Sequence, residues 1–242
     1  MLPWEGRHVA IVQVICQPPA IRSPEPDHPF ALSLSKGCLS LYRGREGQSF
    51  DKLSPNGGLV LYDLIPHPQF SAPDLVISVE AARTVEGTFV IRYLVSGDTD
   101  RILIPQPVRY ASRHPDLWQH TCFEAFVSAG EGADYLEFNF APSTAWDAFK
   151  FSSYRVSGGS FPFPTPHFDV ERPEGRLEVT VALDMTETPE ADASATCHLN
   201  LSAVIEERDG TKSYWALAHA PGPPDFHNRD CFIATLPAPE RP

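Results

Sequence analysis

Residues 118–146 read WQHTCFEAFVSAGEGADYLEFNFAPSTAW, and two segments within them alternate apolar and polar side chains. Successive side chains of a β-strand point to opposite faces, so residues two apart share a face. The pattern predicts a β-hairpin whose strands are joined by a loop at Ser128–Asp134. One face is expected to build core through Phe123, Phe138 and Phe140. The other face carries His120, Cys122 and Glu124 from the first strand and Tyr135, Glu137 and Asn139 from the second.

Short alternating segments continue on both sides of this hairpin. The chain has 25 prolines and 15 glycines, which interrupt it too often for long helices. Residues 144–151 fit either one helical turn or a further strand, and residues 157–167 look irregular. Alternation predicts strands at 75–82, 88–96, 101–105, 176–183, 196–206, 213–217 and 231–236. About nine short strands without a long helix are typical of an all-β fold, here an antiparallel β-sandwich.

Charge and cysteine content bear on the partners and the compartment. The formal net charge is −12 and no Lys/Arg cluster occurs, so we expect no nucleic-acid partner, because phosphate binding needs a basic patch. Five cysteines without CxxC spacing predict neither a zinc nor a disulfide framework and favour a cytoplasmic location. Export is the alternative, because Val9–Cys16 forms a short apolar run after Arg7. No segment approaches the ~20 apolar residues of a membrane helix, so we expect no membrane partner.

The first part of the chain differs from the rest. Residues 1–58 contain Pro-rich segments and short apolar runs without a sustained period, which is a poor basis for a core. Residues at about 28–57, which include HPFALSLSKG and FDKLSPNG, resemble translated dispersed bacterial repeat DNA. We expect residues 1–58 to be an N-terminal extension without ordered structure and residues 59–242 to form the β-sandwich domain. Pairing of Val9–Cys16 as an extra edge strand is the alternative.

Two carboxylates share the polar face of the predicted hairpin. We expect Glu124 to lie opposite Glu137, with Cys122 opposite Asn139. In a glycosidase such a pair divides into an acid and a base or nucleophile. A solvated sheet face is the simpler interpretation of two Glu residues. The nearby side chains favour a ligand-binding surface instead, because they make the polar-aromatic surface typical of small-molecule sites. These are Trp118, His120, Tyr135 and Asn139.

A second polar cluster follows the last long strands. Trp215 and His219 precede a Pro-rich loop that contains Asp225, His227 and Arg229. Asp and His two residues apart are able to chelate a metal ion. The preferred interpretation is a loop stiffened by proline whose polar side chains bond local backbone. We therefore expect no metal. We expect Arg229 to neutralise Glu124 or Glu137, which is a structural role if Arg229 is buried and a functional role if it lines a pocket.

The motifs WQHTCFEAF, YLEFNFAPS, LSAVIEERDGTKSYWALAH and PDFHNRDCF together resemble the DOMON-like family, which is similar to carbohydrate-binding module family 9. The resemblance covers about residues 61–236. It implies a β-sandwich with an aromatic residue, a Glu and later polar groups around a sugar, and Trp118 and Glu124 match that spacing. Other branches of the same superfamily bind haem between a His and a Met side chain. Met185 is the only methionine besides Met1 and nothing pairs it with a His, so we expect no cofactor.

These patterns predict a non-catalytic domain that binds a small molecule, with a saccharide as the ligand that the resemblance implies. In this prediction Trp118 stacks on the ligand, and polar groups of both clusters hydrogen-bond it. The alternative is a hydrolase of glycans or other polar substrates with Glu124 and Glu137 as its acid and base. An interaction module is a third interpretation, which predicts a large exposed apolar patch instead of a cleft. The predicted ligand-binding residues are Trp118, His120, Glu124, Tyr135, Glu137, Asn139, Trp215, Asp225, His227 and Arg229.

Overall fold

The computed structural model describes residues 60–84, 87–130, 132–188 and 195–238. The expected N-terminal extension, its repeat-like segment at about 28–57 and the edge strand at Val9–Cys16 lie outside these residues. Within them the chain forms thirteen strands. They are β1 (Val60–Pro66), β2 (Leu75–Arg83), β3 (Thr88–Gly97), β4 (Ser112–Arg113), β5 (Cys122–Ala129), β6 (Tyr135–Phe140), β7 (Ala145–Ser153), β8 (Val156–Ser160), β9 (His167–Glu171), β10 (Arg176–Asp184), β11 (Cys197–Glu206), β12 (Lys212–Ala216) and β13 (Ala234–Leu236). Short 3-10 turns include η2 (Thr99–Arg101), η3 (Leu117–Gln119) and η5 (Arg229–Cys231).

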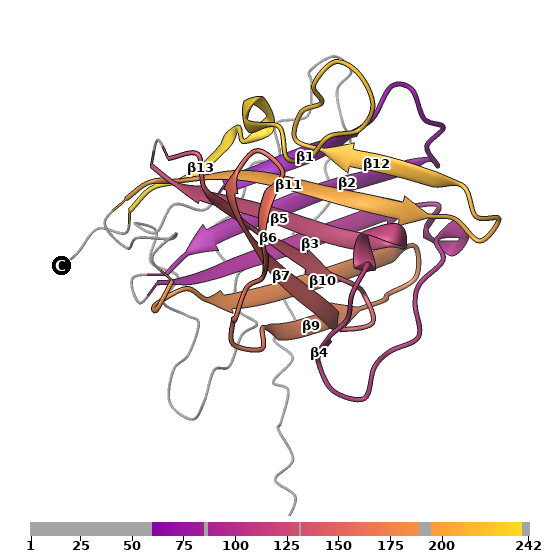
Figure 1. Ribbon diagram of the computed structural model, residues 1–242. Coiled ribbons are helices and arrows are strands. Elements are labelled where there is room, and N and C mark those ends of the chain that lie inside the picture. The colour runs from indigo at the N-terminus through magenta and orange to yellow at the C-terminus, as the bar shows by residue number, and fades with distance from the viewer. Residues whose placement is uncertain (1–59, 85–86, 131, 189–194, 239–242) are drawn as a thin grey trace, which may run out of the picture. The chain divides into compact units, whose positions relative to one another are not determined.

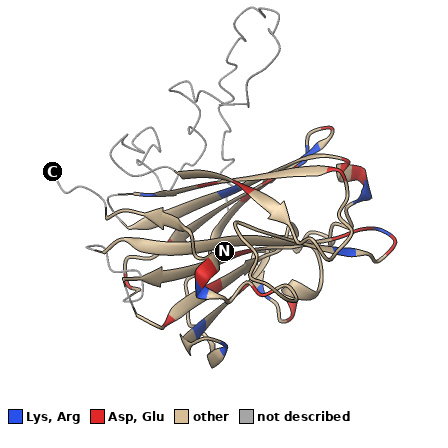
Figure 2. Ribbon diagram, turned by 90° about the horizontal axis from the view of Figure 1, so that it is seen from above, with Lys and Arg blue, Asp and Glu red and all other residues tan. Residues whose placement is uncertain are grey.

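The strands form two layers, which overlie one another in Figure 1. One layer has the order β1-β2-β3-β10-β9, and the other has the order β4-β7-β6-β5-β11-β12-β1. Strand β1 joins the layers, because its first five residues pair with β2 whereas Ile65 and Pro66 pair with β12. The pairs within both layers are antiparallel except β4 with β7. The expected all-β sandwich is confirmed. Most charged residues lie in loops and near strand ends (Figure 2).

The inward faces of the two layers build one continuous core. Phe123, Phe138 and Phe140 are fully buried in it, as the alternation predicted. Trp146 of β7 is also buried there. The opposite layer contributes aliphatic side chains such as Ile77 of β2. Side chains that alternate along each strand therefore divide between this core and the outer faces.

Tyr93 connects the two layers through a hydrogen bond inside the core. Its hydroxyl, on β3, donates to the backbone carbonyl oxygen of Glu124, on β5, at 2.7 Å. Tyr93 is fully buried, so the phenol has no access to water. Loss of a buried hydrogen bond leaves its acceptor unsatisfied, which costs more than the net worth of the bond.

Replacing Tyr93 with phenylalanine is therefore expected to lower the free energy of unfolding by about 1 to 2 kcal/mol. Urea denaturation followed by far-ultraviolet circular dichroism measures this change. Tyr110→Phe is the matched control, because Tyr110 is 72% exposed. An equal effect of both substitutions contradicts the role given to the Tyr93 hydroxyl.

The predicted hairpin forms, but its expected register was wrong by two residues. Glu124 pairs with Asn139, and Glu137 pairs with Phe126, so Glu124 does not lie opposite Glu137. The reason is that β5 continues to Ala129 before the chain turns, so the centre of the turn lies further along the chain than expected. The two carboxylates still share one face of the sheet.

Other strand predictions differ in part from the structure. Residues 101–105 form no strand, since Ile102 makes only an isolated bridge with Glu207. Residues 144–151 contribute to strand β7 rather than to a helical turn. The run at 157–167, expected to be irregular, contains most of β8 and begins β9. Strand β8 consists of Val, Ser and Gly residues on the surface, so it carries no alternation to detect.

Candidate functional site

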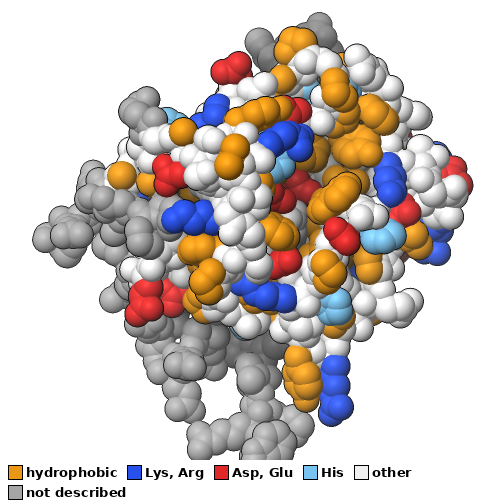
Figure 3. All heavy atoms as spheres, viewed as in Figure 1, with side chains coloured by type: hydrophobic (Ala, Val, Ile, Leu, Met, Phe, Trp, Pro, Cys, Tyr) orange, Lys and Arg blue, Asp and Glu red, His pale blue; other side chains and the backbone are white. Residues whose placement is uncertain are grey.

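A cavity of about 490 Å³ lies on the outer face of the layer that contains β5, β6, β7, β11 and β12. In Figure 3 acidic side chains lie within a hollow of this face, with hydrophobic and basic side chains around it. The polar lining residues are Glu124, Glu137, Arg155, Ser157 and His227. The apolar and aromatic lining residues are Trp118, Phe126, Phe149, Phe151, Val204, Tyr214, Pro224 and Phe226.

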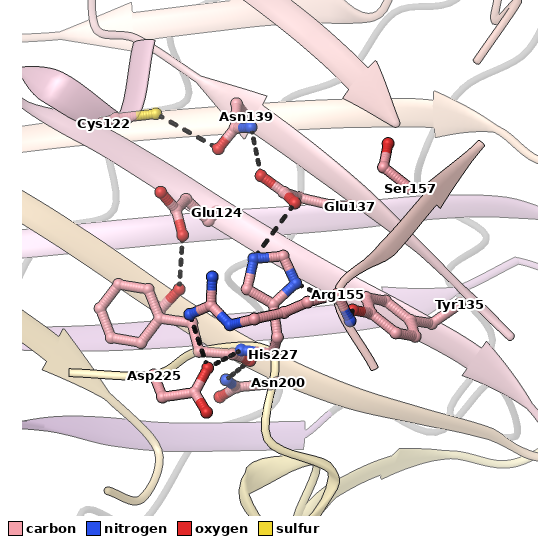
Figure 4. Close-up of polar contacts among 12 residues, drawn as sticks. Cys122, Glu124, Tyr135, Glu137, Asn139, Arg155, Ser157, Asn200, Asp225 and His227 are labelled. Atoms are coloured by element: carbon pink, nitrogen blue, oxygen red, sulfur yellow. Dashed lines mark hydrogen bonds and ion pairs between the residues drawn. The ribbon is translucent and has the colours of Figure 1, made fainter. Parts of the chain in front are cut away.

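Glu124 and Glu137 project from neighbouring strands into this cavity (Figure 4). Glu124 is 3% exposed, and its Oε2 accepts a hydrogen bond from the Ser202 hydroxyl at 3.3 Å. Glu137 is 7% exposed, and its Oε1 accepts a hydrogen bond from the Asn139 amide at 2.7 Å. The Asn139 oxygen in turn lies 3.8 Å from the Cys122 sulfur. Asn139 is thus held in place and orients one of the carboxyl groups.

Burial shifts the protonation of both carboxyl groups. It raises the pKa of Glu124 well above its usual value, and the nearby charge of Glu137 raises it further. The hydrogen bond from Ser202 acts in the opposite direction. Burial also raises the pKa of Glu137 to about 7, although the bond from Asn139 and the charge of Arg155 lower it. The pair therefore holds at least one proton at neutral pH.

His227 lies between Glu137 and the Tyr135 hydroxyl. Its Nδ1 is 2.9 Å from the Tyr135 hydroxyl oxygen, and its Nε2 is 3.8 Å from Oε2 of Glu137. Burial lowers the pKa of His227 to about 4, and the charge of Arg155 lowers it as well. The imidazole is consequently neutral near pH 7 and adds no positive charge to the cavity.

Arg155 closes one side of the cavity from the turn between β7 and β8. Its backbone has a φ of +55°, and its amide donates to the Tyr135 hydroxyl at 3.2 Å. Its guanidinium donates to Oδ1 of Asp225 at 2.8 Å, and the Tyr154 hydroxyl donates to Oδ2 of Asp225 at 2.8 Å. Asp225 lies in the loop between β12 and β13, called the C-terminal loop below, and thus ties the β7–β8 turn to that loop.

Aromatic rings form the rest of the wall. Phe149 and Phe151 of β7 line the cavity, because the alternating residues Trp146 and Ala148 project into the core. Phe151 stacks on Tyr135 with ring centroids 4.8 Å apart. Trp118 lines the cavity with about half of its surface exposed, so the indole is open to a ligand.

The structure brings most of the predicted site residues together from the hairpin and from the C-terminal loop. Four of them line the cavity, namely Trp118, Glu124, Glu137 and His227. Three more hydrogen-bond to residues that line it, namely Tyr135, Asn139 and Asp225. The polar face of the hairpin is therefore one wall of a cavity rather than a solvated surface.

Three predicted residues lie away from the cavity. Trp215 is buried in the core, because β12 turns this side chain inward, and its indole donates to the Ser213 hydroxyl. His120 is mostly exposed, and its Nδ1 lies 2.7 Å from Oε2 of Glu206. Arg229 donates to the carbonyl of Gly132, so it neutralises neither carboxyl group of the pair. These three residues are therefore not part of the candidate site.

Sequence reasoning missed Arg155 and much of the aromatic wall. Arg155 sits in a turn of positive φ, where no periodic pattern marks the direction of a side chain. Phe149 and Phe151 carry a usable signal, since they alternate with core residues along β7. Tyr214 and Phe226 come from β12 and the loop after it, and only the folded chain places them beside β5.

The described residues hold no arrangement typical of a metal centre, since no three or more of their His, Cys, Asp or Glu side chains gather around one point. None of the helices in that part of the chain has the length and hydropathy needed to span a bilayer. Met185, the methionine weighed as a haem ligand, is buried in the core of the sandwich.

Comparison of the sequence with family models and with curated proteins finds no match. Among solved structures, a candidate carbohydrate-binding protein from Bacteroides uniformis matches with a TM-score of 0.54 and 12% identity, over 74% of this chain and 85% of that one. A family 9 carbohydrate-binding module from Caldicellulosiruptor kristjanssonii also matches. Its complex with cellotriose has a TM-score of 0.41, 8% identity and coverage of 66% of this chain and 75% of that one. Its complex with glucose has a TM-score of 0.40, 9% identity and coverage of 76% of this chain and 85% of that one.

The match to the Bacteroides protein shows a shared β-sandwich fold. These structural neighbours are carbohydrate-binding proteins by name, and a family 9 module is among them. Membership of the DOMON-like family stays a prediction, as does the repeat-DNA origin of residues at about 28–57.

Proposed function

We propose that this protein binds a small saccharide in the cavity that Glu124 and Glu137 line. The observation that carries the proposal is the combination of two buried carboxyl groups with an aromatic wall in one cavity. Sugars present hydroxyl groups at their edges and apolar C–H groups on their faces. Carboxyl groups bind the hydroxyls, and aromatic rings pack on the faces.

The size of the cavity supports this proposal. At about 490 Å³ it lies within the range of roughly 300 to 1,000 Å³ that is typical of small-molecule pockets. Trp118 is placed to pack on one face of a sugar ring, and Asn139 orients the carboxyl group of Glu137. The name of the Bacteroides protein with the same fold adds support, since it describes carbohydrate binding.

Replacing Trp118 with alanine is expected to weaken sugar binding about tenfold, because the ligand loses its stacking surface. A thermal-shift screen against mono- and oligosaccharides identifies the ligand, since a ligand that binds the native state raises the unfolding temperature. Isothermal titration then gives the dissociation constants of the two proteins. Tyr110→Ala removes an exposed aromatic residue outside the cavity lining and serves as the control.

Two results of this experiment count against the proposal. One is a screen in which no saccharide raises the unfolding temperature. The other is a Trp118→Ala protein that binds the sugar as tightly as the Tyr110→Ala protein does.

A second candidate function is glycoside hydrolysis, which the unequal environments of the two carboxyl groups favour. Burial raises the pKa of both groups, but Glu124 is the more deeply buried, whereas Glu137 accepts a hydrogen bond from Asn139 and lies near the charge of Arg155. Glu137 is therefore placed to ionise first, with Glu124 as the acid. Below pH 7 both groups hold protons, which leaves no ionised base or nucleophile. Release of nitrophenol from nitrophenyl glycosides at pH 8, and its loss in Glu124→Gln, distinguishes hydrolysis from binding alone.

A further inference from the structure

Two carboxyl oxygens in the cavity have no hydrogen-bond donor within the described part of the chain. Glu124 uses Oε2 for the bond from Ser202, and its Oε1 accepts none. Glu137 uses Oε1 for the bond from Asn139, and its Oε2 is 3.8 Å from the nearest His227 nitrogen, too far for a hydrogen bond. Both side chains are more than nine-tenths buried and line the cavity. The free oxygens therefore face the space that a ligand would fill.

The positive charge near these oxygens is already engaged elsewhere. Arg155 is the one Arg or Lys among the lining residues, and its guanidinium is bonded to Asp225. His227 is neutral near pH 7, since burial lowers its pKa to about 4. Asp147 adds negative charge near Glu137, although it is paired with Arg113. The cavity thus presents two acidic groups to which no Arg or Lys of the described chain is bonded.

The aromatic wall suits a cationic ligand. Phe126, Phe149, Phe151, Tyr214 and Phe226 line the cavity together with the two carboxyl groups. The faces of aromatic rings carry partial negative charge and attract ammonium groups, most strongly where water is excluded. A neutral sugar is able to pack on the aromatic rings, but it leaves an ionised carboxylate in the cavity without a counter-charge.

From this arrangement we infer that the preferred ligand is an amino sugar, whose ammonium group lies between Glu124 Oε1 and Glu137 Oε2 while its ring packs on the aromatic wall. The inference rests on the proposed saccharide binding and specifies its ligand class. An ammonium group has three donors and no acceptor, and its charge favours the ionised form of both carboxyl groups, so in the complex it matches two acceptor oxygens without donors. It also supplies the missing positive charge at a site where Glu137 is ready to ionise, with a pKa of about 7.

The test compares three probes that share one ring, namely D-glucosamine, D-glucose and N-acetyl-D-glucosamine. Isothermal titration at pH 7.5 is expected to show that D-glucosamine binds at least about tenfold more tightly than D-glucose, since a charge-assisted hydrogen bond is worth about that factor. N-acetylation removes the charge, so N-acetyl-D-glucosamine is expected to lose the advantage. In Glu137→Gln the preference for D-glucosamine is expected to disappear. The control is Glu171→Gln, an exposed Glu on β9 in the other layer.

The outcomes separate this inference from the proposed function. If D-glucose binds as tightly as D-glucosamine, the inference is overturned and saccharide binding stands. If none of the three sugars and no other saccharide binds, both fail. If Glu137→Gln is folded by circular dichroism and keeps the full preference, the ammonium group does not lie at the carboxyl pair, and the inference is again overturned.

Discussion

Replacing Glu137 with glutamine is expected to raise the free energy of unfolding at pH 8 by about 3 kcal/mol. The ionised Glu137 carboxylate is buried, and its pKa rises from 4.5 to about 7 on folding. A shift of this size corresponds to about 3 kcal/mol of stability lost when the group is ionised. Glutamine does not ionise, and its amide oxygen still accepts the hydrogen bond from Asn139.

The effect of Glu137→Gln on stability depends on pH. A carboxyl group with a raised pKa binds more protons in the folded state, so its contribution to the free energy of unfolding falls as pH rises from 4.5 to about 7. The advantage of Glu137→Gln should therefore be absent below pH 4.5 and complete above pH 7. The lowered pKa of His227 acts in the opposite direction between about pH 4 and 6.5, but it is common to both proteins.

Urea denaturation from pH 4 to pH 8 measures the difference between the two proteins. The control is Glu171→Gln on the exposed face of β9, for which a change within about 0.5 kcal/mol is expected. A Glu137→Gln protein that is less stable than the wild type at pH 8 would contradict the prediction. Other groups of the chain would then offset the cost of burying the ionised carboxylate.

Replacing Phe138 with alanine is expected to lower the free energy of unfolding by about 3 to 5 kcal/mol, the usual cost of removing a fully buried phenylalanine. Phe138 has no exposed surface and stands on the inward face of β6. Its ring contacts Phe163 with centroids 4.9 Å apart and stacks on Phe140 at 6.3 Å. The substitution therefore leaves a cavity between the two layers.

Chemical denaturation monitored by tryptophan fluorescence gives the size of this effect. Tyr110→Ala is the control, because Tyr110 is largely exposed and its loss creates no internal cavity. Similar losses for the two variants contradict the placement of Phe138 at the centre of the sandwich.

Much of the fold was predictable from local alternation. The hairpin of β5 and β6 was predicted with the correct faces, because Phe123, Phe138 and Phe140 leave only one apolar side for each strand. The register was not predictable, since it depends on where the chain turns. Strand β5 ends at Ala129, two residues later than expected, and Gly130 follows it with a φ of +64°. Strand β8 escaped notice because its exposed Ser and Gly residues follow no period.

The candidate site was predictable only where its residues share a strand pattern or a polar cluster. Glu124, Glu137 and Asn139 follow from the alternation of the hairpin. His227 and Asp225 follow from the polar loop, but nothing local shows that this loop folds back to β6 and to the turn after β7. An aromatic side chain near polar residues in the sequence is able to pack in the core or to contact a ligand, and the sequence does not distinguish the two. Trp215 was predicted as a site residue, but its side chain packs in the core.

Stability and binding are expected to respond to Glu137 in opposite directions. The carboxylate that weakens the folded protein at high pH is also a carboxylate with a free oxygen in the cavity. Glu137→Gln should thus unfold at a higher urea concentration and bind an amino sugar less tightly. Functional sites commonly hold such groups, which cost stability but take part in binding.

The central claim is that saccharide binds in the cavity on the outer face of β5 and β6. The crystal structure of the protein in complex with the best ligand from the thermal-shift screen tests this claim most directly. We predict sugar density in contact with Trp118, with polar sugar atoms within hydrogen-bond distance of Glu124 Oε1 and Glu137 Oε2. Sugar density on another face of the sandwich, or an empty cavity at a saturating ligand concentration, would contradict the claim.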